Sequence, residues 1–191
     1  MSTGFGVLTS EDSRAAADAA TEAHLLGVRP EVAGRARTLI ARAKKAGILL
    51  CITHGFRSTE DQDDLYACGR TKQSEIPCRH GSELRKSGTC GEHPLGATVT
   101  RARGGESWHN WGLAVDVAVI DAGGNPSWPE DEALWRRIGE IGEDLDLQWG
   151  GRFRHFPDRP HFQMTLGLQL AALQSGDQEL PAVRSEDPTP S

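Results

Sequence analysis

The sequence predicts an α+β fold, in which a small antiparallel sheet has helices packed on one of its sides. Three short segments, at 48–53, 112–120 and 161–166, are either continuously apolar or alternate between apolar and polar residues, as strands do. The segments around them carry apolar residues every three or four positions, which is the spacing of a helix that buries one face. The 191 residues suffice for a hydrophobic core that needs no metal or disulfide.

The clearest helix is expected at 30–46, with Pro30 in its first turn and Gly47 as its C-terminal cap. Its apolar positions share one face: Val32, Ala36, Leu39, Ile40 and Ala43. Weaker patterns predict further helices at 13–27, from Ser58 or Thr59 onward, from Ser127 to Leu145 and at 167–174.

The segment 112–120 predicts a strand whose two faces differ. Branched residues alternate with Ala114, Asp116 and Ala118, so Asp116 lies on a face flanked by small side chains. The segment 161–166 alternates in the same way and places His161 on the equivalent face. The apolar run at 48–53 predicts a buried strand in which Cys51 behaves as a small apolar residue.

The overall composition excludes two classes of partner. The formal net charge is −6, which argues against nucleic acid as the main partner. No apolar run approaches the roughly 20 residues that span a bilayer, so no membrane insertion is expected. The first 12 residues lack a basic segment followed by an apolar one, so we expect synthesis in the cytoplasm without a signal peptide.

A single domain is expected at 1–174, with its core at about 30–168. The polar, Pro-containing segment 175–191 is expected to be a disordered tail. A long loop at 69–106 interrupts the pattern and is rich in Gly, Ser and charge. It contains Cys78, His80, Cys90 and His93. Three interpretations stay open: a second, structural metal site, a disulfide between Cys78 and Cys90 outside the cell, or free thiols.

Two imidazoles and one carboxylate form a candidate zinc site: His109, Asp116 and His161. Zinc in hydrolases commonly takes three protein ligands and keeps a fourth position for water. Such a site needs a general base, and Asp158 can reach it because only a Pro-containing turn separates it from His161. On spacing alone, ordinary core or surface histidines remain the alternative.

The motif Ser107-x-His109-x-x-Gly112-x-Ala114-x-Asp116, followed by Asp158-x-Pro160-His161-Phe162, resembles a known signature. It is that of the D-alanyl-D-alanine carboxypeptidase and L-alanyl-D-glutamate endopeptidase family, the zinc peptidases of bacterial cell-wall peptides. Gly55-Phe56-Arg57-Ser58 and Trp149-Gly150-Gly151 fit the same pattern. The resemblance covers roughly residues 30–168 and implies the fold shared by these peptidases and hedgehog-type domains.

The resemblance implies a role for each matching residue. One zinc ion per chain is held by His109, Asp116 and His161, and Asp158 is the catalytic base. Arg57 steadies the substrate carbonyl or oxyanion, while Ser107 and Gln62 lie near the substrate. The inserted loop with its Cys and His residues departs from the family pattern.

The function implied is hydrolysis of peptide bonds in peptidoglycan stem peptides by a monomeric enzyme. The Asp-x-Pro-His-Phe motif favours an L-alanyl-D-glutamate endopeptidase that acts as a phage or prophage endolysin and reaches the cell wall after release. A D-alanyl-D-alanine carboxypeptidase is the alternative within the family. A non-catalytic, zinc-containing binding module of the same fold is the second alternative.

Overall fold

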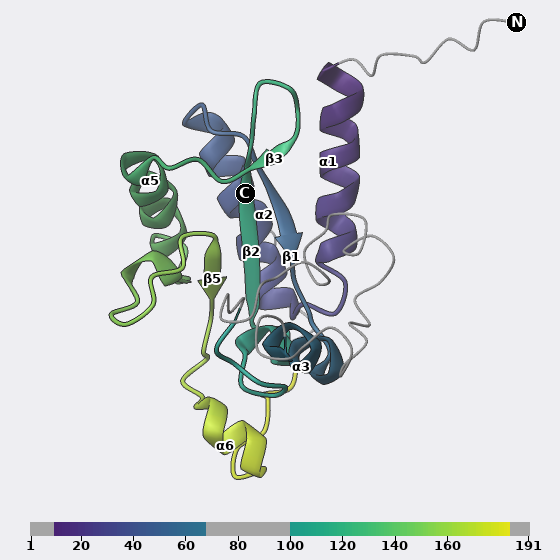
Figure 1. The fold of residues 1–191 in the computed structure, drawn as a ribbon, viewed down its shortest axis with the longest axis vertical. Helices are drawn as coiled ribbons and strands as arrows, with labels where there is room; N and C mark the ends of the chain where they lie inside the picture. Colours follow the sequence, from purple (N-terminus) through teal and green to yellow (C-terminus); the bar gives the residue numbers. More distant parts are fainter. Residues whose placement is uncertain (1–9, 68–99, 184–191) are drawn as a thin grey trace, which may run out of the picture. The chain divides into compact units, whose positions relative to one another are not determined.

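The computed structural model describes residues 10–67 and 100–183, which form two compact units (Figure 1). The first unit comprises 10–56, 113–164 and residue 183, and the second comprises 57–67, 100–112 and 165–182. The alternatives for Cys78, His80, Cys90 and His93 lie outside the described residues. So does the end of the predicted tail, from 184 onward. The single domain expected at 1–174 stays a prediction.

A five-stranded antiparallel sheet forms the centre of the first unit. Its strands run in the order β1-β2-β5-β4. Strand β3 pairs with the C-terminal end of β2, whereas β5 pairs with its N-terminal end. The predicted class, a small antiparallel sheet combined with helices, is confirmed. The strands are Leu50–His54 (β1), Ala114–Ile120 (β2), Pro126–Ser127 (β3), Gln148–Trp149 (β4) and His161–Gln163 (β5).

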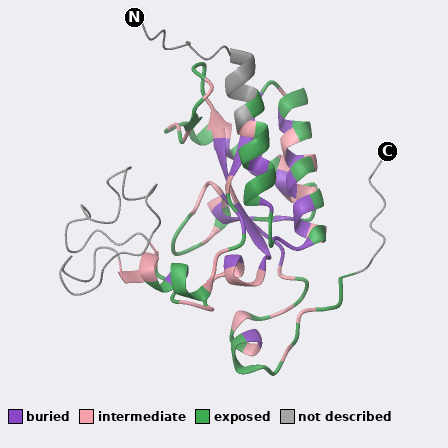
Figure 2. Cartoon of the chain, turned by 90° about the vertical axis from the view of Figure 1, so that its right-hand side faces the viewer, coloured by how far each residue is buried: buried purple, intermediate pink, exposed green. Residues whose placement is uncertain are grey.

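Three helices of this unit pack against the sheet or against one another: Ser10–His24 (α1), Pro30–Lys45 (α2) and Glu132–Glu143 (α5). Four of the five apolar positions predicted for the core face of α2 are buried, including Leu39, which is fully inaccessible, and Ile40 is half-buried. Burying one such side chain contributes about 1.5–3 kcal/mol. Figure 2 shows the buried strands beside the buried stripes of the helices. Gly47 follows α2 with φ of 81°, as expected of a residue that ends a helix.

Strand β1 is buried along its first half. Cys51 is 3% exposed, and its thiol lies 3.9 Å from the carbonyl oxygen of Ala118. Burial raises the pKa of this thiol, and the contact with Ala118 only partly offsets the effect. The prediction of Cys51 as a small buried residue is therefore confirmed.

The second unit contains Thr59–Ala67 (α3), the 3-10 helix Trp108–Trp111 (η1) and Leu170–Ser175 (α6). Ser58 caps α3, because its hydroxyl oxygen accepts a hydrogen bond of 3.0 Å from the backbone N–H of Asp61. None of the helices within 10–67 and 100–183 has both the length and the apolar character needed to cross a membrane.

Two predicted boundaries were wrong. The helix expected from Ser127 begins at Glu132, where Asp131 caps it by accepting a hydrogen bond from the backbone N–H of Leu134 at 2.9 Å. Ser127 instead pairs with Val119 in the sheet. The strand expected at 161–166 ends at Gln163, and Leu166 has φ of 53°, a left-handed conformation outside the extended region that strands adopt.

Candidate functional site

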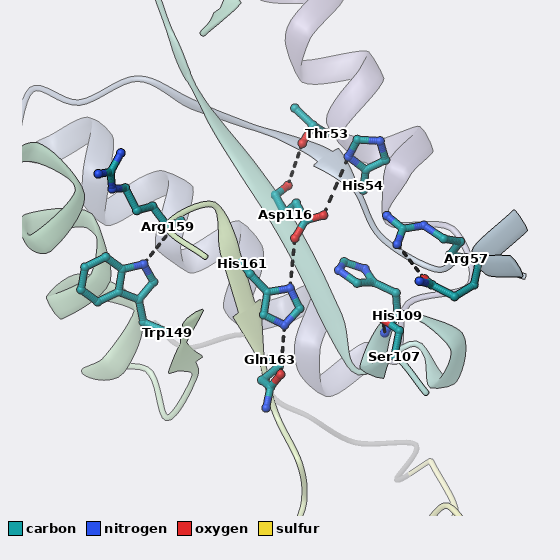
Figure 3. A network of polar contacts seen from close by, with 11 residues as sticks. Thr53, His54, Arg57, Ser107, His109, Asp116, Trp149, Arg159, His161 and Gln163 are labelled. Atoms are coloured by element: carbon teal, nitrogen blue, oxygen red, sulfur yellow. Dashed lines mark hydrogen bonds and ion pairs between the residues drawn. The ribbon is translucent and has the colours of Figure 1, made fainter. Parts of the chain in front are cut away.

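Three polar side chains form a row across the middle of the sheet (Figure 3). Asp116 in β2 lies opposite His54 in β1 on one side and opposite His161 in β5 on the other. Residues directly opposite one another in antiparallel strands bring their side chains close together. The strand pairing therefore places the carboxylate of Asp116 between two imidazoles.

The Asp116 carboxylate is close to both histidines, but its distance to each of them differs. Its Oδ1 lies 3.1 Å from Nδ1 of His161, and its Oδ2 lies 3.9 Å from Nδ1 of His54. The side chain of His161 is 10% exposed, whereas that of His54 is 52% exposed. Asp116 and His161 thus form the enclosed half of the row, and His54 forms its solvent-facing end.

The environment of His161 shifts its titration in the metal-free chain. Burial alone lowers the pKa of the imidazole, whereas the hydrogen bond and the negative charge of Asp116 raise it. Gln163 and the charge of Asp158 act in the same direction, so the pKa of His161 is raised. The negative charge of the Asp158 carboxylate therefore acts on the imidazole of His161, which belongs to the same sequence motif.

His109 lies in η1, the short helix that leads into β2. Ser107 caps this helix by accepting from the backbone N–H of His109 at 3.4 Å, and Gly112 ends it with φ of 66°. His109 is only 3% exposed. Ser107 therefore has a structural role in holding the turn that carries His109, and its contact with substrate stays a prediction.

The ligand atoms offered by His109, Asp116 and His161 all lie within 4.8 Å of one another. Two imidazole nitrogens and one carboxylate oxygen are a common donor set for zinc that leaves one position open. Two of the three groups are among the few buried polar residues of the described chain, and a buried polar group needs a partner. The residues fit a zinc ion by number, chemistry and spacing.

Asp158 begins a tight turn that ends at His161. The backbone N–H of His161 donates to the carbonyl oxygen of Asp158 at 3.3 Å. The backbone N–H of Asp158 donates to the carbonyl oxygen of Gly150 at 2.9 Å. The indole N–H of Trp149 donates to the carbonyl oxygen of Arg159 at 2.8 Å. The predicted Pro-containing turn is present, and the Trp149–Gly150 segment fixes its position.

Arg57 and Gln62 belong to the second unit, and their side chains are hydrogen-bonded to each other. Nη1 of Arg57 donates to Oε1 of Gln62 at 2.9 Å, and Nε2 of Gln62 donates to the carbonyl oxygen of Ala102 at 2.9 Å. Gln62 is completely buried, which favours support of Arg57 over direct contact with a substrate. The proposed roles of both residues at the substrate stay predictions.

Asn110 is a supporting residue that the sequence reasoning missed. Its side-chain oxygen accepts from the backbone N–H groups of Gly105 and Ser107 at 3.0 and 3.2 Å. Its side-chain nitrogen donates to the carbonyl oxygens of Arg57 and Ser58 at 3.0 and 3.1 Å. One amide thereby ties the segment of Arg57 to the turn that carries His109. The only signal in the sequence was its position three residues after Ser107, where a capping partner stands.

Gln163 is the second residue that the sequence reasoning missed as part of the site. It follows His161 by two positions, so the period of a strand puts both side chains on one face of β5. Its Oε1 lies 2.9 Å from Nε2 of His161. The alternation noted at 161–166 was sufficient to find it.

Comparison with known proteins agrees with this arrangement. Residues 100–164, which include the three candidate ligands and Asp158, match the family model described as D-alanyl-D-alanine carboxypeptidase. The chain is 36% identical over 144 residues to the peptidoglycan L-alanyl-D-glutamate endopeptidase CwlK of Bacillus subtilis (strain 168). That alignment covers 72% of this chain and 73% of CwlK.

Solved structures of related peptidases show a weaker likeness. The L-Ala D-Glu endopeptidase ChiX of Serratia marcescens is 23% identical, with a TM-score of 0.48 over 78% of this chain and 88% of ChiX. The vancomycin-resistance D,D-pentapeptidase VanY, solved in complex with Zn(II), is 18% identical, with a TM-score of 0.45 over 78% of this chain and 76% of VanY.

Proposed function

Because the chain belongs to the D-alanyl-D-alanine carboxypeptidase (M15) family of peptidases, we propose that it is a zinc-dependent endopeptidase of peptidoglycan stem peptides. The scissile bond we assign is that between L-alanine and D-glutamate. The observation that carries the proposal is the convergence of His109, Asp116 and His161 within 4.8 Å, in a chain 36% identical to an enzyme of that specificity.

The proposed metal is one zinc ion per chain, held by His109, Asp116 and His161. When bound, zinc supplies a Lewis acid that polarises the scissile carbonyl and lowers the pKa of water toward about 7. The burial of both imidazoles supports this assignment, since a water-poor site strengthens each electrostatic interaction within it.

The chain's own residues hold the substrate and move the proton. The Asp158 carboxylate accepts the proton of the attacking water and later returns it to the departing amine, as a general base and acid. The Arg57 guanidinium donates hydrogen bonds to the carbonyl oxygen as negative charge develops there. The bond from Arg57 to Gln62 supports this role, because it restricts the guanidinium before substrate arrives.

The test is mass spectrometry of the products released from purified sacculi by the zinc-loaded chain. An L-alanyl-D-glutamate endopeptidase releases peptides that begin with glutamate and leaves a single alanine attached to each cleaved muramic acid of the glycan strands. The proposed specificity is wrong if free D-alanine is the only product. That outcome would favour the second candidate, a D-alanyl-D-alanine carboxypeptidase, which is the description of the matching family model.

Asp158→Asn is the matched variant for the base, because it keeps the shape of the side chain and removes its basicity. A rate loss of about 10²–10⁴-fold is expected, with zinc still bound. Asp146→Asn, at an exposed position, is the control. Unchanged hydrolysis by Asp158→Asn would show that the base lies elsewhere.

Two broader assignments belong to the same proposal. We assign the chain a role as a monomeric lysis enzyme of a phage or prophage, on the resemblance of its Asp158-x-Pro160-His161-Phe162 motif to endolysins. Light scattering of the purified chain and loss of turbidity of cells exposed to it from outside test these two assignments. A stable dimer, or intact cells alongside cleaved sacculi, would contradict them.

A further inference from the structure

Gln163 connects His161 to the neighbouring strand through two hydrogen bonds. Gln163 is 7% exposed and lies opposite Gln148 of β4 in the register of the sheet. Its Nε2 donates to Oε1 of Gln148 at 3.0 Å, and its Oε1 lies 2.9 Å from Nε2 of His161. The three side chains therefore form one line of hydrogen bonds across β4 and β5.

The direction of these bonds determines which ring nitrogen of His161 carries a proton. An amide oxygen only accepts hydrogen bonds, so Oε1 of Gln163 requires an N–H at Nε2 of the imidazole. A neutral ring then has its lone pair on Nδ1, the atom that lies 3.1 Å from Oδ1 of Asp116. A nitrogen lone pair and a carboxylate oxygen repel each other at this distance unless a cation or a proton lies with them.

We propose that Gln163 is a positioning residue that holds the His161 proton on Nε2 and thereby leaves Nδ1 as the metal-binding atom. The inference rests on the zinc site of the proposed function and assigns the ligand atom and its support. Partners of this kind fix the orientation of a ligating imidazole and increase its basicity. Gln148 acts behind Gln163, because accepting from its Nε2 keeps the amide oxygen turned toward His161.

The reverse arrangement makes the proposal testable. If both amide groups were rotated, Gln163 would donate to Nε2 of His161, and the proton would move to Nδ1. That nitrogen would then donate to Asp116 and would have no lone pair for a metal. The two arrangements differ in the protonated nitrogen and in the affinity for zinc.

The first measurement is ¹⁵N NMR of the wild-type, zinc-loaded chain. The expected spectrum has a protonated Nε2 in His161 and a metal-bound Nδ1, which correlations from the ring protons to each nitrogen distinguish. A proton on Nδ1 with the metal on Nε2 would overturn the proposal. This measurement requires no substitution, so it does not depend on how a variant folds.

The second measurement is zinc affinity by competition with a chelator, for two variants and a control. Gln163→Leu removes the acceptor and should weaken zinc binding by about 10–100-fold. Gln163→Glu keeps an acceptor for the Nε2 proton and should bind zinc as tightly as the wild type or more tightly. Gln174→Leu, at an exposed position on α6, should bind zinc like the wild type.

The outcomes separate this inference from the proposed function. An affinity of Gln163→Leu within twofold of the wild type would overturn the inference, even if sacculi are cleaved at the expected bond. Expected spectra and affinities without cleavage would support the inference and overturn the proposed function. A wild-type chain that binds no zinc would overturn both. Circular dichroism with chelator present shows whether each variant is folded before metal is added.

Discussion

Gly150 lies directly against the backbone of Asp158, and the space between them has no room for a side chain. A Cβ at position 150 would lie 2.5 Å from the carbonyl oxygen of Asp158 and 3.0 Å from Cβ of His161. The glycine thus sets how closely the turn with the proposed base approaches β4. The sequence did not predict this role for Gly150, because the need for a glycine at position 150 arises from how the turn packs.

Gly150→Ala should destabilise the fold by about 1–3 kcal/mol, because the added methyl group meets backbone that cannot rotate away. Hydrolysis should fall further than stability explains, since the displaced turn carries Asp158. Gly34→Ala on α2 is the control, because nothing lies within 4 Å of its added Cβ, and a gain of roughly 0.5–1 kcal/mol is expected. Urea unfolding and rates on sacculi measure both effects. Equal behaviour of the two variants would contradict the prediction.

Asp116→Asn should lower zinc affinity by at least about tenfold, because it replaces the anionic ligand by a neutral amide. It should also lower the pKa of His161 in the metal-free chain, since Asp116 is the main cause of the upward shift. Chelator competition and NMR titration of the imidazole measure the two effects. Asp146→Asn is again the control. An unchanged pKa of His161 would show that groups other than Asp116 stabilise its protonated form.

The stability of the metal-free chain should fall as the pH rises through the folded pKa of His161. This pKa is raised above the ordinary value of about 6.5, so the folded chain binds the proton more tightly than the unfolded chain. The contribution is complete below about pH 6.5 and is lost above the folded pKa. Zinc affinity should change in the opposite direction, because the proton leaves the ligand as the pH rises. Thermal melts across pH, with chelator and with zinc, measure both trends. Parallel trends would contradict the prediction.

Gln62→Leu should cost about 1–3 kcal/mol of stability, because it leaves the half-buried carbonyl oxygen of Ala102 without this donor. It should also lower kcat more than it raises KM, because Arg57 loses a partner that restricts it before the transition state. Gln62→Glu keeps an acceptor for Arg57 and should retain more of kcat. Steady-state kinetics on a soluble stem peptide decide the point. A pure rise in KM would instead assign Gln62 to substrate binding.

Asn110→Ala should destabilise the second unit by roughly 2 kcal/mol or more, because four hydrogen bonds of one amide are lost together. Asn110→Asp keeps both acceptor contacts and should be intermediate. Hydrogen exchange of the backbone amides of Gly105 and Ser107 reports the loss directly. If both amides exchange at the wild-type rate in Asn110→Ala, the side chain does not hold the turn.

The elements with a long repeating pattern were predictable, and the two-residue strands were not. The apolar spacing in α2 and the alternation in β2 placed Leu39 in the core and Asp116 on a face with small neighbours. The strands β3 and β4 have two residues each, which is too few for any periodicity. The termini of α5 and β5 depended on a cap at Asp131 and a left-handed residue at Leu166.

The site was predictable as a set of residues but not as a geometry. His109 and Asp116 are near each other in the chain, and a motif contains both. The pairing of Asp116 with His161 depends on the register of β2 against β5, across 45 residues of sequence. The amides of Asn110 and Gln163 act through hydrogen bonds whose direction no residue pattern contains.

The burial of Cys51 provides a chemical filter for the other three cysteines. A thiol that is 3% exposed and has a raised pKa reacts slowly with alkylating reagents, so rapid labelling of the folded chain reports Cys68, Cys78 and Cys90. Labelling at all three indicates free thiols, and a disulfide between Cys78 and Cys90 removes two of them until a reductant is added. Protection that a chelator reverses indicates a second metal. One cysteine in the core thus allows a reagent count to distinguish the three interpretations of the inserted segment.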